Sequence, residues 1–167
     1  LLEGLVTTLR AQMRVSRVLV LMQDPLSGAY RVQAQSGVDL LDEPGTLDLD
    51  DASTVIEWLR ENGESLPREE LSARVPAGTR QALVDEMTRL QVSVVVPMLD
   101  EGRLMGVIAL GEKSNRETFF PGDLKVLEAI ATEILHEVKY RRMEEQVFHS
   151  NKLIELGTIA AGVAHEI

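Results

Sequence analysis

The chain has 167 residues, a net charge of −10 and no cysteine, and 44% of its residues are hydrophobic. This length and composition suffice for one domain with its own core, with or without an appendage. The acidic balance argues against nucleic acid and anionic membrane surfaces as partners, because both attract a basic face. The lack of cysteine excludes a disulfide framework, a cysteine metal site and a cysteine nucleophile.

The first part of the chain predicts a helix followed by a β-hairpin. Over residues 1–13, apolar side chains recur at steps of three and four, which is the pattern of an amphipathic helix. Residues 17–24 predict a largely buried strand, and residues 29–37 alternate between apolar and polar side chains as a half-buried strand does. The short turn between them contains Gly28, so the two strands should form a hairpin.

Two helices are expected in the middle of the chain, after a loop over 38–51. Acidic and hydroxyl side chains at the end of this loop offer N-cap oxygens for a helix that runs through Arg60, and Gly63 supplies the usual C-terminal signal. Residues 64–71 are expected to be extended. Residues 76–90 predict a further helix with its apolar side chains on one side.

Residues 91–99 and 103–113 predict two strands joined by a tight turn. Both are rich in β-branched residues and almost continuously apolar, so we expect them at the centre of the sheet. Pro121 and Asp123 then suit the first turn of a helix.

One long helix is expected over 124–156, because no proline or glycine interrupts this stretch. An apolar stripe on its first part predicts either a two-helix seam or packing against the sheet. The stripe consists of Leu124, Leu127, Ala131, Ile134 and Val138. It weakens at the next positions in the same phase, Arg141, Glu145 and Phe148, and resumes later, one residue out of phase. The charged stretch between the two apolar stripes needs a partner helix. The shift of the second stripe by one residue is typical of a junction between two helical modules.

The stretch VVVPMLDEGRLMGVIALGEKSNRETFFPGDLKVLEAIATEI, residues 94–134, resembles the second half of a GAF domain. The family pattern is a strand ending in proline, a short turn, a glycine-centred strand and Phe-x-x-Asp at the opening of the last helix. The preceding hairpin and helices follow the family order as well. The resemblance implies an α+β fold over residues 1–140. It has a central antiparallel sheet of about five or six strands, flanking helices and a long C-terminal coiled-coil or signalling helix.

The last stretch, NKLIELGTIAAGVAHEI at residues 151–167, resembles the H-box of sensor histidine kinases. In that family the histidine receives the γ-phosphoryl group of ATP and passes it to an aspartate on a response regulator. The resemblance implies that His165 is the phosphoacceptor and that Glu166 assists as an acid or base. His165 lies off the apolar stripe, and its small neighbours leave the imidazole reachable for phosphoryl transfer.

Together the two resemblances imply a cytoplasmic two-component sensor kinase that forms a homodimer through its C-terminal helices. Residues 1–140 are then the GAF-like sensor domain, 141–152 a helical linker, and 153–167 the truncated start of the dimerisation and phosphoacceptor domain. ATP and Mg²⁺ are expected to bind to the full-length protein and not to this segment. The reason is that this sequence shows no glycine-rich phosphate loop and no ATP-binding motif of the kinase family. We therefore interpret the chain as a segment of a longer enzyme that is inactive by itself.

A ligand pocket is the second candidate site. In GAF domains it lies between one sheet face and the intervening helices, here about residues 36–90. The lack of cysteine excludes a thioether-linked bilin, and the lack of any histidine before His136 argues against an imidazole ligand for haem. A small organic ligand and a purely mechanical role both stay open. We interpret Asp48, Asp50 and Asp51 as a solvated cluster at a helix start, so no metal site is expected.

A different class of protein also stays open. The chain is alternatively the GAF sensor or dimerisation module of a transcriptional activator or a second-messenger enzyme, with a coincidental terminal helix. In addition, His136 and His149 are interpreted as structural or solvated. No apolar run in the sequence reaches the length of a membrane span.

Overall fold

The computed structural model describes residues 1–38, 43 and 45–166, with side chains in the last helix as far as residue 155. Of the loop expected over 38–51, residues 39–42 and 44 therefore lie outside the described part. The chain divides into two compact units, Leu1–Leu135 and His136–Ile167. The first unit contains the sheet, and the second is formed by the rest of the last helix.

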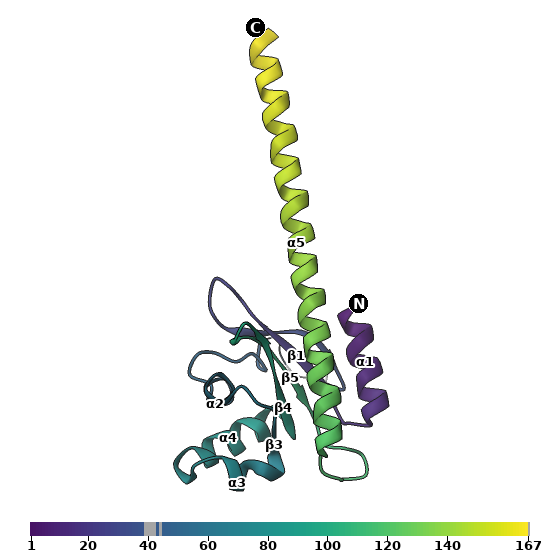
Figure 1. Ribbon diagram of the computed structural model, residues 1–167, viewed down its shortest axis with the longest axis vertical. Coiled ribbons are helices and arrows are strands. Elements are labelled where there is room, and N and C mark those ends of the chain that lie inside the picture. Colours follow the sequence, from purple (N-terminus) through teal and green to yellow (C-terminus); the bar gives the residue numbers. More distant parts are fainter. Residues whose placement is uncertain (39–42, 44, 167) are drawn as a thin grey trace. The chain divides into compact units, whose positions relative to one another are not determined.

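A five-stranded antiparallel sheet forms the centre of the first unit (Figure 1). Its strands are β1 (Val18–Gln23), β2 (Tyr30–Ser36), β3 (Leu66–Pro67), β4 (Val94–Asp100) and β5 (Arg103–Leu110). They lie in the order β2-β1-β5-β4-β3, with β5 at the centre between β1 and β4. The predicted α+β fold, its first hairpin and the central place of β5 are confirmed.

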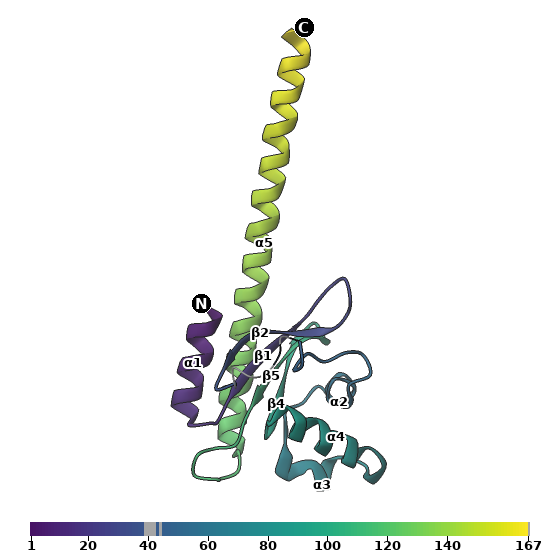
Figure 2. The same cartoon turned by 180° about the vertical axis from the view of Figure 1, so that it is seen from behind.

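Helices cover both faces of this sheet (Figures 1 and 2). On one face lie α1 (Leu2–Met13) and the first part of α5 (Pro121–Glu166). On the other lie α2 (Thr54–Asn62) and α4 (Ala77–Leu90), while η1 (Arg68–Glu70) and α3 (Leu71–Arg74) lead from β3 to α4. As predicted, a hydroxyl begins α2 and a glycine ends it: Ser53 Oγ accepts a hydrogen bond from Ile56 N at 3.2 Å, and Gly63 has φ 63°.

Both faces of the sheet are buried, which explains why its strands are almost continuously apolar. Leu19 and Leu21 of β1 belong to a core with side chains of α2 and α4. The alternate residues Val18, Val20 and Met22 point to the opposite face, and they are also buried.

The apolar stripe at the beginning of α5 packs on the sheet beside α1 (Figure 2). Leu127, Ala131 and Ile134 are buried, as are Val6 and Leu9 of α1. The sequence predicted either a two-helix seam or packing against the sheet for this stripe. In the first unit, the stripe packs against the sheet.

Gly106 of β5 is paired with Met22 of β1 on one side and with Met98 of β4 on the other. A Cβ atom at this position would lie 2.5 Å from the backbone O of Leu21 and 2.5 Å from Cε of Met98. A glycine is needed here because no side chain fits between the strands.

The segment expected to be extended over 64–71 is extended only in part, so this prediction was wrong. β3 has just two residues, and the chain then turns into η1 and α3. The Arg68 backbone N donates to the backbone O of Ser93 at 2.7 Å, beside the end of the β3–β4 pairing. The turn that follows brings Leu71 into the core, where it is 3% exposed. Tertiary burial thus decides a conformation that the local sequence leaves undetermined.

This end of the sheet carries one proline on β3 and one on β4. β3 pairs only with Val94 and Val95, and Pro67 is its second residue. Pro97 of β4 follows shortly after the paired residues. Because proline has no N–H, it is tolerated in a sheet mainly at such edges.

The second unit, as far as its side chains are described, is a largely exposed helix. From His136 to Glu155 every side chain is exposed, except those of Val138, Arg141 and Arg142, which are half-buried. Among the described residues of the whole chain, no helix is both long enough and apolar enough to cross a membrane.

Candidate functional site

The sheet face toward α2 and α4, where the resemblance places a ligand pocket, is filled by side chains. Tyr30 and Leu59 are fully buried there, and Trp58 is 7% exposed. The Tyr30 hydroxyl donates to the backbone O of Leu104 at 2.7 Å, which satisfies the polar end of this aromatic residue. Two clefts border the core, one beside β2 and one between α2 and α4.

The cleft between α2 and α4 has a volume of about 300 Å³, and Trp58 and Arg74 are among the residues that line it. The Arg74 guanidinium lies 5.2 Å from the centre of the Trp58 ring, within range of a cation–π interaction. Glu64 and Glu70 also hold this guanidinium, at 2.5 and 2.7 Å. Arg74 is therefore fixed over an aromatic ring by carboxylates on the preceding segment.

Polar contacts lead from this cleft to the beginning of α5. Nη1 of Arg74 donates to the backbone O of Ser65 at 2.8 Å. Ser65 is 3% exposed, and its Oγ donates to Oε1 of Glu128 on α5 at 3.0 Å. A second contact joins η1 to the loop before α5, since the Phe119 backbone N donates to Oε1 of Glu69 at 2.8 Å. Within the first unit, the Ser65–Glu128 contact therefore reaches α5 directly, and the Glu69–Phe119 contact reaches the loop before it.

The beginning of α5 is held by Lys113 and Asp123. Nζ of Lys113 lies 2.7 Å from Oδ2 of Asp123, and the same oxygen accepts a hydrogen bond from the Phe120 backbone N at 2.9 Å. The hydrogen bond from Lys113 is the main cause that lowers the pKa of Asp123 below its ordinary value of 3.8, and the Phe120 N–H adds to it. Nζ of Lys113 also lies 5.1 Å from the ring centres of Phe119 and Phe120. These contacts tie the loop after β5 to the first turn of the helix.

Glu86 joins α4 to the N-terminus of α2. One of its carboxylate oxygens accepts a hydrogen bond from the Ser53 hydroxyl, and the other accepts from the Thr54 backbone N at 3.1 Å. A negative charge at this end of a helix is favourable, because the first N–H groups lack partners within the helix. The pair of contacts fixes the two helices that border the cleft.

The acids that precede α2 each have a separate structural partner. Asp48 and Asp50 each accept a hydrogen bond from a backbone N–H at 2.9 Å, and Asp51 lies 3.2 Å from Arg60. Over the part of the chain that the structure describes, no three histidine, aspartate or glutamate side chains gather as a metal site would need.

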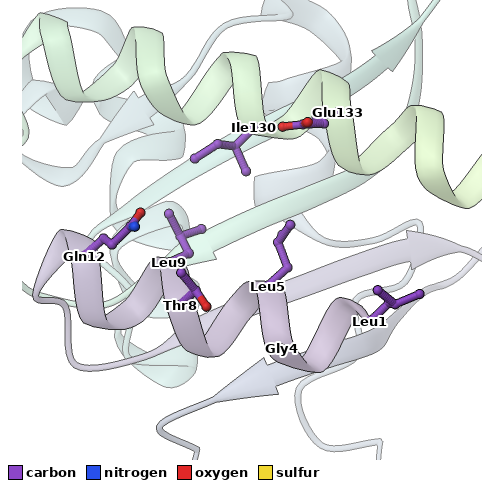
Figure 3. Close-up of a pocket in the computed structure, with 8 residues that line it drawn as sticks. All are labelled: Leu1, Gly4, Leu5, Thr8, Leu9, Gln12, Ile130 and Glu133. Atoms are coloured by element: carbon purple, nitrogen blue, oxygen red, sulfur yellow. The ribbon is translucent and has the colours of Figure 1, made fainter.

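A larger groove of about 660 Å³ lies between α1 and α5 in the first unit (Figure 3). Figure 3 shows Leu5 and Leu9 extending from α1 on the side of Ile130 of α5. Leu5 is 36% exposed, so the apolar stripe predicted for this helix is only partly covered. Gln12 and Glu133 add polar groups to the lining.

The structure places His165 and Glu166 on the last turn of α5, which is helical through Glu166. Their side chains lie outside the described ones, so the phosphoacceptor and acid–base roles stay predictions. His136 and His149 are exposed on the second unit, in keeping with the solvated positions expected for them.

The sequence did not single out Arg74, Ser65, Glu69 or Glu128. The hydrogen bond from Arg74 to Ser65 spans nine residues, and that from Ser65 to Glu128 spans 63. Contacts of this kind have no local motif, and the serine and the acids are common residue types on their own.

Comparison with known proteins identifies the fold. The model of the GAF domain matches residues 1–137. The chain is similar to the GAF domain of a phosphoenolpyruvate-protein phosphotransferase from Coxiella burnetii, with a TM-score of 0.65 and 17% identity over 86% of this chain and 83% of that one. It is also similar to the blue-light absorbing form of the PixJ GAF domain of Thermosynechococcus elongatus, with a TM-score of 0.63 and 17% identity over 89% and 88%.

A further similar structure is that of a methyl-accepting chemotaxis protein, with a TM-score of 0.61 and 22% identity over 78% of this chain and 82% of that one. At these identities the likeness shows the fold alone. Among curated protein sequences, none matches this chain.

The sheet order, the helices on both faces and these matches define an α+β domain with the GAF fold. The chain belongs to the GAF domain family. The resemblance drawn from residues 94–134 is thereby confirmed.

Proposed function

We propose that the chain is the sensory and transmitter segment of a two-component sensor histidine kinase. In this proposal the GAF domain regulates the ATP-dependent phosphorylation of His165 and the transfer of the phosphoryl group to a response regulator. The observation that carries the proposal is the continuity of α5. This helix begins in the GAF domain and continues without interruption to Glu166, through the sequence that resembles an H-box.

The proposed chemistry assigns a role to each residue of the terminal pair. An unprotonated ring nitrogen of His165 attacks the γ-phosphorus of ATP, the bond to the β–γ bridging oxygen breaks, and ADP leaves. Glu166 accepts the proton that the imidazole then loses, or orients the ring. ATP and Mg²⁺ are bound by the kinase domain of the full-length protein. An aspartate on the receiver domain of the response regulator takes the phosphoryl group in the second transfer.

On the sensory side, the contacts from the Arg74 cleft to α5 support regulation through the beginning of this helix. A ligand that competes with Glu64 and Glu70 for Arg74, or a neighbouring domain that moves α2, acts on Ser65 and through it on Glu128. A small organic ligand and a mechanical input both fit this route.

The proposed kinase is a cytoplasmic homodimer. The exposed apolar side chains of Tyr140, Met143 and Val147 support pairing, because a helix with so little packing of its own needs a partner. Neither nucleic acid nor a membrane is proposed as a partner of this segment, in keeping with its net charge of −10.

A GAF sensor or dimerisation module of another signalling protein is the alternative. It is favoured by the range of similar structures, which includes GAF domains of a phosphotransferase and a photoreceptor as well as a chemotaxis protein. In a transcriptional activator or a second-messenger enzyme, His165 is an ordinary helical residue.

Labelling of the intact protein with γ-³²P-ATP tests the proposal. His165→Gln is compared with wild type and with His149→Gln, a matched change on the same helix. Wild type and His149→Gln should both acquire acid-labile, base-stable phosphate, whereas His165→Gln should acquire none. Label that survives in His165→Gln, or its absence from all three proteins, overturns the proposal and makes the alternative the leading interpretation.

A further inference from the structure

The Arg74 cleft lies between helices and not against the sheet. Its lining comes from α2, from the end of α3 and from α4, and among the described residues that line it none belongs to a strand. It is therefore separate from the sheet-facing space that the family resemblance assigns to a ligand, which core side chains fill. Its volume of about 300 Å³ lies at the lower end for ligand pockets, so the cleft suits a small molecule.

Two carboxylates line the α2 side of this cleft. Glu57 and Glu61 are about one helical turn apart, so they lie on the same face of α2 as Trp58, and both are exposed. Within the part of the chain that the structure describes, no ion pair involves either of them. Because like charges at this spacing repel each other, a cationic group beside both carboxylates is favourable.

The guanidinium of Arg74 lines the α3 side. Its position is fixed by the ring of Trp58 and by the hydrogen bond to the backbone O of Ser65. The side chains of its partners Glu64 and Glu70 are 68 and 41% exposed, and ion pairs this exposed contribute little to stability. A ligand carboxylate can therefore replace one of them while Arg74 stays in place. A planar guanidinium binds such a carboxylate through two parallel N–H groups.

The combination of charges selects the class of ligand. A simple anion meets repulsion from Glu57 and Glu61, and a simple cation gains nothing from Arg74. A molecule that carries both charges interacts favourably with both sides. Trp58 and Pro76 add apolar surface to the lining, which suits a short carbon chain between or beside the charged groups.

We propose that this cleft binds a free amino acid as a zwitterion. Its carboxylate pairs with Arg74, and its ammonium group pairs with Glu57 and Glu61. Its carbon chain contacts Trp58. The inference deepens the proposed function and rests on it, because it assigns the input signal of the proposed kinase to this ligand.

Thermal unfolding of the intact protein with each of the common L-amino acids tests the class of ligand. At least one amino acid should raise Tm in a saturable way, by roughly 5 °C at about 100 times its dissociation constant. The same amino acid with its amino group acetylated, or with its carboxyl group amidated, should bind at least about tenfold more weakly, because each derivative keeps one of the two charges. A Tm that no amino acid changes overturns the proposal, as does equally tight binding of either derivative.

Substitutions in the cleft test the place of binding. Glu57→Gln and Glu61→Gln change exposed side chains, so the double variant should fold normally and should bind the amino acid about tenfold more weakly. Arg74→Lys keeps the charge but loses the parallel N–H groups, and it should weaken binding by a similar factor. Glu144→Gln on the second unit and Arg68→Lys outside the cleft are the matched controls, with expected changes below about twofold. An unchanged dissociation constant in the double variant or in Arg74→Lys overturns the cleft as the site.

Labelling of His165 with γ-³²P-ATP, with and without the amino acid, separates this inference from the kinase proposal. If the amino acid binds in the cleft while His165 acquires no label, the site is supported and the kinase proposal is wrong. If His165 is labelled while no amino acid binds, the site is wrong and the kinase proposal stands. If His165 is labelled at a rate that the bound amino acid leaves unchanged, its role as the input signal is overturned.

Discussion

Replacing Asp123 by asparagine should loosen the beginning of α5, because its carboxylate has three favourable interactions there. It pairs with Lys113 at 2.7 Å, accepts the Phe120 N–H at 2.9 Å and lies in the first turn, where the helix dipole favours a negative charge. The Lys113 side chain is 11% exposed, so the ion pair contributes about 1 kcal/mol, the upper end for pairs near the surface. The dipole adds about 0.5 kcal/mol. Asparagine keeps the size and an acceptor but removes the charge, and the free energy of unfolding should fall by about 1.5 kcal/mol.

Thermal unfolding at neutral pH measures this loss. For a chain of this length, the change corresponds to a decrease in Tm of about 5 °C. Glu117→Gln removes an exposed acid from the same loop and is the matched control, with an expected shift below about 1 °C. Asp123→Ala also removes the acceptor for the Phe120 N–H and should cost about 1 kcal/mol more.

The pH dependence of the stability difference between wild type and Asp123→Asn is an independent test that the Asp123 charge stabilises the folded protein. The pKa of Asp123 is lowered in the folded protein below the ordinary value of 3.8. The stabilisation is therefore complete above that value and is lost as the pH falls through the lower folded pKa. The difference between wild type and Asp123→Asn should be constant from about pH 5 to 8 and should shrink below about pH 4. A difference that grows on acidification, or an unchanged Tm at neutral pH, would refute the reasoning.

Glu86→Ala should lower the free energy of unfolding by about 1–2 kcal/mol, because the N-terminus of α2 loses its acceptors on α4; a change below about 0.3 kcal/mol in urea unfolding would contradict this. Gly106→Ala should lower Tm by about 6 °C or more, because a Cβ atom has no room there. Gly4→Ala, where a Cβ has no neighbour within 4 Å, should leave Tm unchanged or raise it. Similar Tm shifts for the two variants would contradict the close packing at Gly106. In the proposed kinase, Ser65→Ala and Glu128→Ala should each change the phosphorylation rate of the intact protein, and the double variant should match the single ones because all three lack the same hydrogen bond. Additive changes would exclude a shared contact.

The elements with a strong periodic pattern were predictable, because a single packing rule determines each of them. The run Val18 to Met22 is apolar at every position, and the structure buries it from both sides. The hydroxyl of Ser53 and the φ of Gly63 begin and end α2 for local reasons that are visible in the sequence.

The segment after β3 was not predictable in the same way. Leu71 and Arg74 have no local pattern that favours a short helix over an extended chain. Their positions depend on the core and on Trp58, Glu64 and Ser65, which the fold brings together. For the same reason a contiguous motif points to His165, whereas the contacts that lead to Glu128 become visible only in three dimensions.

The outer edge of β4 has a consequence for how copies of this chain associate. An open strand edge is a template for a further strand, and it is a common cause of aggregation and strand exchange. Here β3 occupies the start of the edge for only two residues, and Pro67 and Pro97 supply no N–H groups to an incoming strand. Growth of the sheet from this side into ribbons or fibrils is therefore disfavoured. In the proposed homodimer, the copies associate through helical surfaces instead, and this association ends at a closed pair.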